Sequence, residues 1–328
     1  MDPATHGHEG IPAMNGSRIV AIGHYQPARV LTNDDLAAMV DTSDEWIRSR
    51  VGIRTRRIAG PDEPVDELAA HAAAKALAAA GLTPDDIDLV LVATSTAIDR
   101  SPNTAARVAA RLGMPGPAVL DVNVVCAGFT HALATADHTL RAGAATRALV
   151  IGADKMSDVT DWTDRSTCVL VGDGAGAAVL TACPPGSAPG IGPVLWGSVP
   201  AMGHAVRIEG TPPRFAQEGQ SVYRWATTRL PAIARQACEK AGVAPEELAG
   251  VVLHQANLRI IEPLAHKLGA VNAVIARDVT ESGNTSAASI PLAFSKLLEQ
   301  GALRSGDPVL LFGFGGNLSY AGQVVRCP

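Results

Sequence analysis

The sequence predicts an α/β protein built from two similar halves. When the 328-residue chain is displaced by 161 positions against itself, residues 80–96 align with 241–257 and residues 149–153 align with 310–314, without a gap. In both halves an Ala-rich helix is followed by a Pro-acidic turn and then by an apolar strand. Apolar strands without polar alternation, placed between helices, indicate a mostly parallel sheet that is covered on both faces.

The boundaries of the two halves follow from the same pattern. The Ala-rich helices are expected over residues 66–80 and 227–241, each followed by a glycine suited to a C-cap. The Gly/Pro-rich segment 183–193 is the natural junction between the halves. We therefore expect a flexible tail over residues 1–15, an N-terminal half over residues 16–185 and a C-terminal half over residues 186–328.

Composition excludes several classes of protein. The net charge of −5 and the absence of a Lys/Arg block argue against nucleic-acid binding. No apolar run approaches the ~18 residues that a membrane helix needs. The five cysteines show neither close pairs nor metal-ligand spacing, so no disulfide framework and no metal site are expected. Without a secretory signal at its start, the chain is expected to be cytoplasmic.

Four segments carry residues suited to chemistry. Cys126 follows a short strand and precedes a helix, where the helix dipole and free N–H groups favour the thiolate. His254 follows the apolar strand 251–253, Asn284 lies in a Gly-Asn-Thr bend, and residues 312–322 form a glycine-rich segment. Taken singly, each has an ordinary alternative: a core thiol, a structural histidine, a turn-forming asparagine. The repeat brings their strand ends together, at the edge where α/β sheets place their sites.

These segments, with several others, match one family motif by motif. The marks are Asp41–Arg54 (DTSDEWIRSRVGIR), Cys-Ala-Gly-Phe at 126–129, Asp-Arg-Ser-Thr at 164–167, Gly172–Val179 (GDGAGAAV), His-Gln-Ala-Asn-Leu-Arg-Ile-Ile from 254 and Gly-Asn-Thr-Ser-Ala-Ala-Ser from 283. From about residue 17 to its C-terminus, the chain resembles the β-ketoacyl-acyl carrier protein synthase III enzymes. The resemblance implies a thiolase-like five-layer α-β-α-β-α fold and a homodimer.

The resemblance also implies a catalytic triad of Cys126, His254 and Asn284. Cys126 would attack the thioester of an acyl-CoA and hold the acyl group covalently. His254 and Asn284 would then donate hydrogen bonds to the enolate oxygen formed when a malonyl thioester on an acyl carrier protein loses CO₂. The N–H groups of Cys126 and, by alignment, Gly316 would form the oxyanion hole. No metal or redox cofactor is required.

The substrate-entry residues carry over from the same family. Trp46 and Arg165 would hold the CoA adenine between them by stacking and cation–π attraction, with Arg50 at the entrance. Four positions align with the pantetheine tunnel: Gly219, Tyr223, Ala256 and Asn257. Three basic positions could dock an acidic carrier protein: Arg224, Arg259 and Lys267. The ordinary alternatives are a helix-packing tryptophan and solvated basic side chains.

Two departures bear on the substrate. Ser101 stands where some family members carry a large aromatic that closes the acyl pocket from the partner subunit, so its small side chain favours a longer, branched or bulkier starter. Asn317 stands where many members have a third glycine. Ser-Tyr-Ala-Gly at 319–322 is more typical of priming synthases of aromatic polyketide pathways than of housekeeping fatty-acid enzymes.

Other functions are less consistent with these residues. A degradative thiolase needs a second catalytic cysteine in the C-terminal glycine loop, which here reads Phe-Gly-Gly-Asn. A nucleotide-binding loop at residues 172–176 has the wrong spacing and is followed by an apolar strand. The main alternative is a non-condensing acyltransferase that moves the acyl group from Cys126 to another acceptor. Such an enzyme would not need Asn284.

Overall fold

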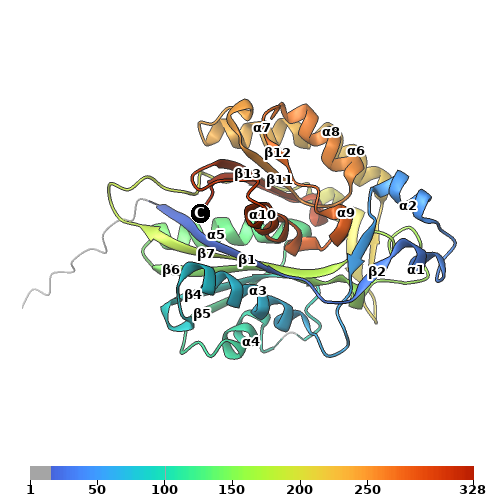
Figure 1. The fold of residues 1–328 in the computed structure, drawn as a ribbon, viewed down its shortest axis with the longest axis horizontal. Coiled ribbons are helices and arrows are strands. Elements are labelled where there is room, and N and C mark those ends of the chain that lie inside the picture. Colours follow the sequence, from blue (N-terminus) through green and yellow to red (C-terminus); the bar gives the residue numbers. More distant parts are fainter. Residues whose placement is uncertain (1–15, 100) are drawn as a thin grey trace, which may run out of the picture.

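The computed structural model describes residues 16–99 and 101–328 (Figure 1). The expected N-terminal tail lies outside the described residues. Within the described part, two five-stranded sheets alternate with three layers of helices. The expected five-layer α-β-α-β-α arrangement is therefore confirmed.

The two sheets have the same strand order. In the first sheet the order is β1 (Gly16–Tyr25), β7 (Asp173–Cys183), β6 (Arg147–Lys155), β4 (Leu89–Ala93) and β5 (Ala118–Val122). In the second it is β8 (Leu195–Gly197), β14 (Tyr320–Arg326), β13 (Pro308–Phe314), β11 (Gly250–Leu253) and β12 (Val274–Ile275).

The strand directions are mixed rather than mostly parallel. Strands β5, β4 and β6 are parallel neighbours, as are β12, β11 and β13. Strands β7 and β14, however, run antiparallel to both of their neighbours. Each of them folds back from the preceding strand without a crossover helix, and a parallel pair needs such a crossover.

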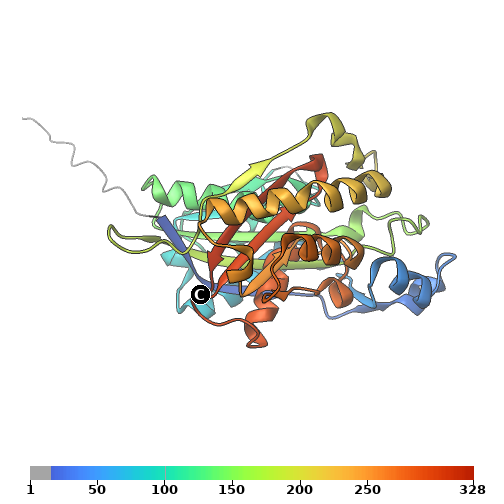
Figure 2. The same ribbon diagram turned by 90° about the horizontal axis from the view of Figure 1, so that it is seen from above.

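The helices form an outer layer on each sheet and a shared central layer (Figures 1 and 2). Helices α3 (Val65–Ala80) and α4 (Thr104–Arg111) cover the first sheet. Helices α5 (Gly128–Arg141) and α10 (Ser289–Glu299) lie between the sheets. Three helices cover the second sheet: α6 (Gly219–Thr228), α7 (Leu230–Lys240) and α8 (Leu258–Leu268).

Smaller elements surround one end of this stack. They are helices α1 (Asn33–Ala37), α2 (Asp44–Val51) and α9 (Val279–Ser282), the pair β2 (Val30–Thr32) and β3 (Thr55–Arg57), and the pair β9 (Val206–Glu209) and β10 (Arg214–Gln217). Three short 3₁₀ turns lie at strand and helix ends: η2 (Val125–Ala127), η6 (Ser286–Ala288) and η7 (Gly316–Leu318).

The internal repeat extends to fine backbone detail. Turns η2 and η6 are 161 positions apart, and so are the first residues of α5 and α10. Val125 and Ser286, which begin these turns, have positive φ angles of 48° and 49°. A positive φ is uncommon outside glycine, and its occurrence at both equivalent positions marks a constrained turn before each central helix.

Small residues let the central layer pack closely on the sheets. A Cβ added to Gly176 of β7 would stand 2.6 Å from the backbone nitrogen of Leu292 in α10. Gly174 of the same segment also packs on α10, because a Cβ there would stand 2.9 Å from Cδ1 of Leu292. Strand β4 is fully buried, as a strand covered on both faces should be.

Candidate active site

Cys126 lies in the tight turn between the first sheet and the central layer. Strand β5 ends at Val122, η2 carries the cysteine, and α5 begins at Gly128. The start of α5 packs closely on the second half, because a Cβ on Gly128 would lie 3.4 Å from the Cβ of Ala287 in η6. Cys126 is 7% exposed, so its thiol faces the interior of the molecule.

The sequence predicted that Cys126 favours the thiolate form, but in the structure its pKa is raised rather than lowered. Burial raises the pKa of the thiol to about 11. The Ser286 hydroxyl and the backbone N–H groups of Gly316 and Cys126 lower this pKa, whereas the buried Asp154 raises it. The N–H groups thus act in the expected direction, but desolvation outweighs them, and the thiol is protonated at neutral pH.

The glycine-rich segment reaches Cys126 from the second sheet. Strand β13 ends at Phe314, and η7 carries Gly316. The N–H of Gly316 acts on the Cys126 thiol and lowers its pKa. Asn317 is exposed and has a positive φ of 58°, a conformation that glycine adopts without strain and that Asn tolerates better than most residues.

His254 stands at the end of β11, as predicted. Its backbone N–H donates to the carbonyl of Phe312 on the neighbouring β13 (2.9 Å), and its ring meets Phe314 edge-on with centroids 5.3 Å apart. The Nδ1 atom lies 2.8 Å from the Ser289 hydroxyl. Burial lowers the pKa of His254 to about 3, so the imidazole is neutral: one ring nitrogen donates a hydrogen bond and the other accepts one.

Asn284 is fixed by its backbone and by one side-chain bond. Its N–H donates to the carbonyl of Leu170 (2.7 Å), and its carbonyl accepts from the N–H of Gly172 (3.1 Å). Its Oδ1 accepts from the N–H of Ser286 (2.9 Å), which orients the amide. Within residues 16–99 and 101–328, no protein group accepts a hydrogen bond from Nδ2, so this donor remains for a substrate.

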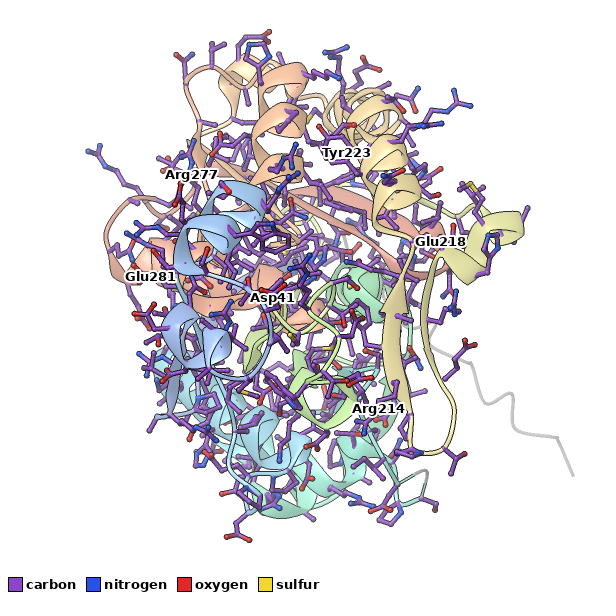
Figure 3. All side chains as sticks on the ribbon, turned by 90° about the vertical axis from the view of Figure 1, so that its right-hand side faces the viewer. Asp41, Arg214, Glu218, Tyr223, Arg277 and Glu281 are labelled. Atoms are coloured by element: carbon purple, nitrogen blue, oxygen red, sulfur yellow. The ribbon has the colours of Figure 1, made fainter. Side chains whose placement is uncertain are left out.

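Several predicted entrance residues line one groove of about 630 Å³. It lies between α6 and the start of α8, next to α2. Figure 3 looks onto this end of the molecule, with Tyr223 on α6 and Asp41 before α2 both labelled. Six of its lining residues are ones predicted from the sequence: Arg50, Gly219, Tyr223, Arg224, Asn257 and Arg259.

Trp46 and Arg165 form the expected pair. The Arg165 guanidinium lies 5.4 Å from the centroid of the Trp46 ring. Arg165 also donates to the backbone carbonyl of Asp41 (2.7 Å) and contacts its carboxylate (3.2 Å). Since Trp46 and Arg50 share helix α2, the pair stands near the groove.

Five predicted entrance residues do not line this groove: the Trp46–Arg165 pair, Ser101, Lys267 and Ala256. Ser101 is exposed in the loop before α4 and belongs to the first half. Lys267 is exposed and donates from Nζ to the carbonyl of Thr227 (2.8 Å), a residue that lines the groove. Ala256 is half-buried just after His254, and its N–H donates to the His254 carbonyl (2.9 Å).

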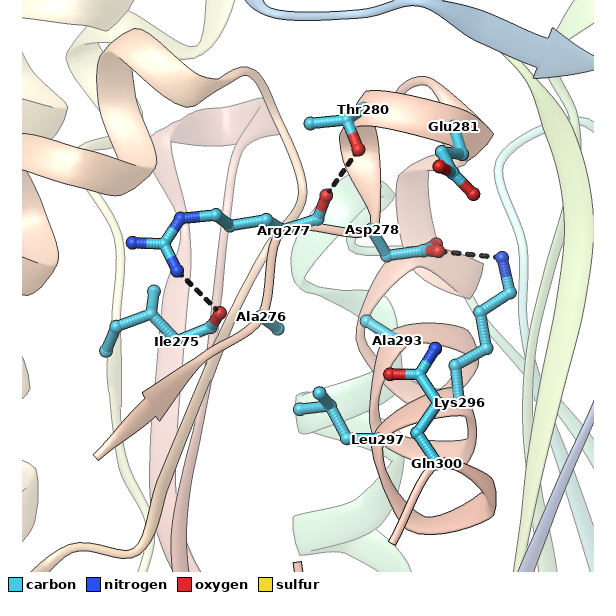
Figure 4. Close-up of a pocket in the computed structure, with 10 residues that line it drawn as sticks. All are labelled: Ile275, Ala276, Arg277, Asp278, Thr280, Glu281, Ala293, Lys296, Leu297 and Gln300. Atoms are coloured by element: carbon cyan, nitrogen blue, oxygen red, sulfur yellow. Dashed lines mark hydrogen bonds and ion pairs between the residues drawn. The ribbon is translucent and has the colours of Figure 1, made fainter. Parts of the chain in front are cut away.

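A second cavity, of about 300 Å³, lies between α9 with the segment before it and α10 (Figure 4). Its walls carry charges of both signs, with Lys296 bonded to Asp278 at 2.7 Å. None of the residues that line it is among the predicted site residues. The residues expected to carry the chemistry therefore lie elsewhere in the molecule.

Sequence reasoning missed Asp154 and Ser289. Asp154 is the last residue but one of β6 and is fully buried, and its carboxylate accepts from the N–H of Ser95 (2.8 Å) and of Ala287 (2.9 Å). A carboxylate at the end of an apolar strand was a usable signal for Asp154. Ser289 was visible only as the last residue of a family motif.

The described residues hold no group of three His, Cys, Asp or Glu side chains placed to bind a metal ion. No helix among them is long and apolar enough to cross a bilayer. All five cysteines are unpaired and buried.

Similarity to known proteins covers nearly the whole chain. Residues 120–199 match the family described as 3-oxoacyl-[acyl-carrier-protein (ACP)] synthase III, and residues 238–327 match its C-terminal part. Beta-ketoacyl-[acyl-carrier-protein] synthase III 2 of Streptomyces avermitilis is 85% identical over 315 residues, which is 96% of this chain and 100% of that protein. The Mycobacterium marinum mycobacterial beta-ketoacyl-[acyl-carrier-protein] synthase III is 45% identical over 94% of this chain and 95% of its own.

Solved structures agree with this result. The priming beta-ketosynthase from the R1128 polyketide biosynthetic pathway superposes with a TM-score of 0.93 at 39% identity, covering 97% of this chain and 98% of its own. The 3-oxoacyl-[acyl-carrier-protein] synthase III of Aquifex aeolicus gives 0.89 at 39% identity, covering 95% and 100%. Fold and site define a thiolase-like, acyl-transferring condensing enzyme. The chain belongs to the 3-oxoacyl-[acyl-carrier-protein] synthase III family, whose initiating condensation it performs.

Proposed function

We propose that Cys126, His254 and Asn284 carry out this condensation, with acyl-CoA as the acyl donor and a malonyl group on an acyl carrier protein as the extender. The observation that carries the proposal is that the segments bearing these residues meet around one buried thiol. The Gly316 N–H and the Ser286 hydroxyl act on Cys126. Asn284 Oδ1 accepts from the N–H of that same Ser286, and the His254 ring packs against Phe314, which precedes the glycine-rich turn.

In the first step, Cys126 Sγ attacks the acyl-CoA carbonyl. A new carbon–sulfur bond forms, the bond to the CoA sulfur breaks, and the Cys126 proton leaves with CoA. The negative charge on the carbonyl oxygen of the tetrahedral intermediate is stabilised by the N–H groups of Cys126 and Gly316. The raised pKa of the thiol favours an acyl-enzyme that holds its acyl group until the second substrate arrives.

In the second step, the malonyl thioester loses CO₂. The electron pair of the broken carbon–carbon bond moves into an enolate, whose oxygen accepts hydrogen bonds from His254 and Asn284. The enolate carbon then attacks the acyl-Cys126 carbonyl, and the thiolate leaves and is reprotonated. A neutral His254 suits this step because its ring N–H donates a hydrogen bond to the enolate oxygen while the ring itself carries no charge.

The groove supports the assignment of the substrate entrance. Its three arginines, Arg50, Arg224 and Arg259, suit the phosphates of CoA and an acidic carrier protein. Lys267 belongs to the same proposal as a docking residue on the outer face of α8. No metal or redox cofactor takes part in the proposed steps, and the unpaired cysteines support a cytoplasmic location.

The exposed edge of the first sheet supports a homodimer. Strand β5 ends that sheet, and Leu120 on it is 49% exposed, although long apolar edges are normally covered. Ser101 lies in the loop that precedes the neighbouring helix α4 and, by family resemblance, faces the partner's acyl pocket. We propose that its small side chain leaves room for a starter bulkier than acetyl. The division into halves at residues 185 and 186 is part of the same proposal.

The test is to combine the protein with an acyl-CoA and malonyl-ACP and to follow 3-oxoacyl-ACP. Wild type should form it, and Cys126→Ala should not. Cys126→Ala should still decarboxylate malonyl-ACP, and Asn284→Ala should lose that step by about 100-fold or more. Acyl transfer without any malonyl decarboxylation would instead identify a non-condensing acyltransferase.

A further inference from the structure

The Ser289 hydroxyl contacts two neighbouring groups at the end of β11. Its Oγ lies 2.8 Å from Nδ1 of His254 and 3.2 Å from the backbone nitrogen of Gln255. Ser289 is 1% exposed and is the first residue of α10, in the central layer. The buried Ser289 side chain therefore contacts the Nδ1 side of the His254 ring.

The direction of these hydrogen bonds follows from the groups involved. A backbone N–H can only donate, so Ser289 Oγ accepts from Gln255. The hydroxyl proton then needs an acceptor. In the part of the chain that the structure describes, Ser289 Oγ has no side-chain partner other than His254 Nδ1. The hydroxyl therefore donates to Nδ1, which must be the unprotonated ring nitrogen.

This arrangement places the ring proton of His254 on Nε2. The imidazole is neutral, because burial lowers its pKa to about 3, and a neutral imidazole carries one N–H. With Nδ1 occupied as an acceptor, Nε2–H is the only donor. No described residue forms a hydrogen bond with Nε2, so this N–H is left to a substrate oxygen.

We infer that Ser289 is a positioning residue that holds His254 in the Nε2–H tautomer, and that the Gln255 N–H holds the Ser289 hydroxyl in the donating orientation. The catalytic consequence rests on the proposed function: only this tautomer can donate to the enolate oxygen during malonyl decarboxylation. Acylation of Cys126 does not use that hydrogen bond and should be nearly independent of Ser289.

The tautomer itself can be measured without any activity. In ¹⁵N–¹H correlation spectra of the full-length protein labelled at its histidine rings, with His254 assigned from a His254→Gln variant, we expect an unprotonated Nδ1 and a protonated Nε2. In Ser289→Ala the spectrum should shift toward the Nδ1–H form. A protonated Nδ1 in wild type would overturn the inference, whatever the enzyme turns over.

The kinetic test uses malonyl-ACP decarboxylation in a Cys126→Ala background and, separately, Cys126 acylation in the otherwise native protein. Ser289→Ala should slow decarboxylation about tenfold and change acylation less than twofold. Ser289→Thr, which keeps the hydroxyl, should restore most of the loss.

Ser295→Ala is the matched control. Ser295 lies on the same helix, is 1% exposed and makes the same kind of contact, 2.9 Å from Nδ1 of His24. Its removal should leave both rates unchanged. Equal losses in decarboxylation and acylation for Ser289→Ala, or no loss in either, would contradict the inference. A wild type that never decarboxylates malonyl-ACP would refute the proposed function and leave the tautomer result standing.

Discussion

Gly315 lies directly against Cys126. A Cβ placed on Gly315 would stand 2.6 Å from Cβ of Cys126 and 3.0 Å from its Sγ. In the first half, the position equivalent to Gly315 is Asp154, whose carboxylate accepts from the N–H of Ala287, the residue equivalent to Cys126. The same place in the repeat therefore holds a buried carboxylate in one half and, in the other, the empty space that the thiol needs.

Gly315→Ala is expected to remove acylation of Cys126 while leaving the fold intact. The added methyl group must displace the thiol, and a displacement of about 1 Å costs about 100-fold in rate. The free energy of unfolding should fall by at least about 1–3 kcal/mol, the usual cost of overpacking, because an alanine is also strained at the Gly315 φ of 158°. Acylation followed by mass spectrometry and thermal unfolding measure the two effects.

The control for Gly315→Ala is Gly116→Ala, because a Cβ on Gly116 meets nothing within 4 Å. It should change neither quantity. Normal acylation of Gly315→Ala would show that the thiol is not held where the structure has it.

Alkylation of Cys126 by iodoacetamide should depend steeply on pH. Only the thiolate reacts, and a pKa near 11 keeps the thiol protonated at neutral pH. The rate at Cys126, read from its peptide by mass spectrometry, should rise about tenfold for each pH unit from 7 to 10. A plateau reached by pH 8 would mean that the helix terminus, rather than burial, determines the pKa of the Cys126 thiol.

Decarboxylation by Cys126→Ala should not fall between pH 8 and pH 5. The folded-state pKa of His254 is lowered to about 3, so the ring stays neutral, and remains the same hydrogen-bond donor, throughout this range. A histidine with its ordinary pKa near 6.5 would change charge in this window. A titration of the decarboxylation rate around pH 6 to 7, with intact malonyl-ACP, would contradict the buried neutral ring.

Arg165→Ala is expected to weaken acyl-CoA binding. A cation–π contact of this kind contributes about 0.5–1 kcal/mol, so KM for acyl-CoA should rise about two- to fivefold with little change in kcat. The control is Arg107→Ala on α4, which removes an ion pair with Asp99 and should leave KM unchanged. A fall in kcat at constant KM would place Arg165 elsewhere in the reaction.

Arg259→Glu tests the carrier-docking role of the groove. Reversing this exposed charge should raise KM for malonyl-ACP about tenfold at low ionic strength, and added salt should reduce the difference. Arg304→Glu, an equally exposed change outside the groove, should have no such effect. Equal KM values for both variants at low salt would remove Arg259 from the docking surface.

The repeat could be predicted from the sequence because both halves keep the same spacing of apolar strands and glycines. The direction of β7 could not, since a buried strand of alanines and glycines has the same pattern in either direction. The residues at the end of each strand were equally visible. Cys126, His254 and Asn284 all follow strands or bends that the pattern located.

The contacts that support the active-site residues could not be predicted from the sequence. Asp154 and Ala287 are 133 positions apart, and His254 and Ser289 are 35 apart, so only the folded chain shows that they meet. The pKa of Cys126 depends on how completely the thiol is buried. That quantity is set by both halves together and reverses the local effect of the helix terminus.

The central claim is that Cys126 holds the acyl group. Intact-protein mass spectrometry after mixing with a panel of acyl-CoAs, including acetyl and bulkier or branched groups, tests it most directly. Wild type should gain the mass of one acyl group, and Cys126→Ala should gain none. Acylation of Cys126→Ala to the same extent, or no acylation of wild type by any acyl-CoA or acyl carrier protein, would contradict it.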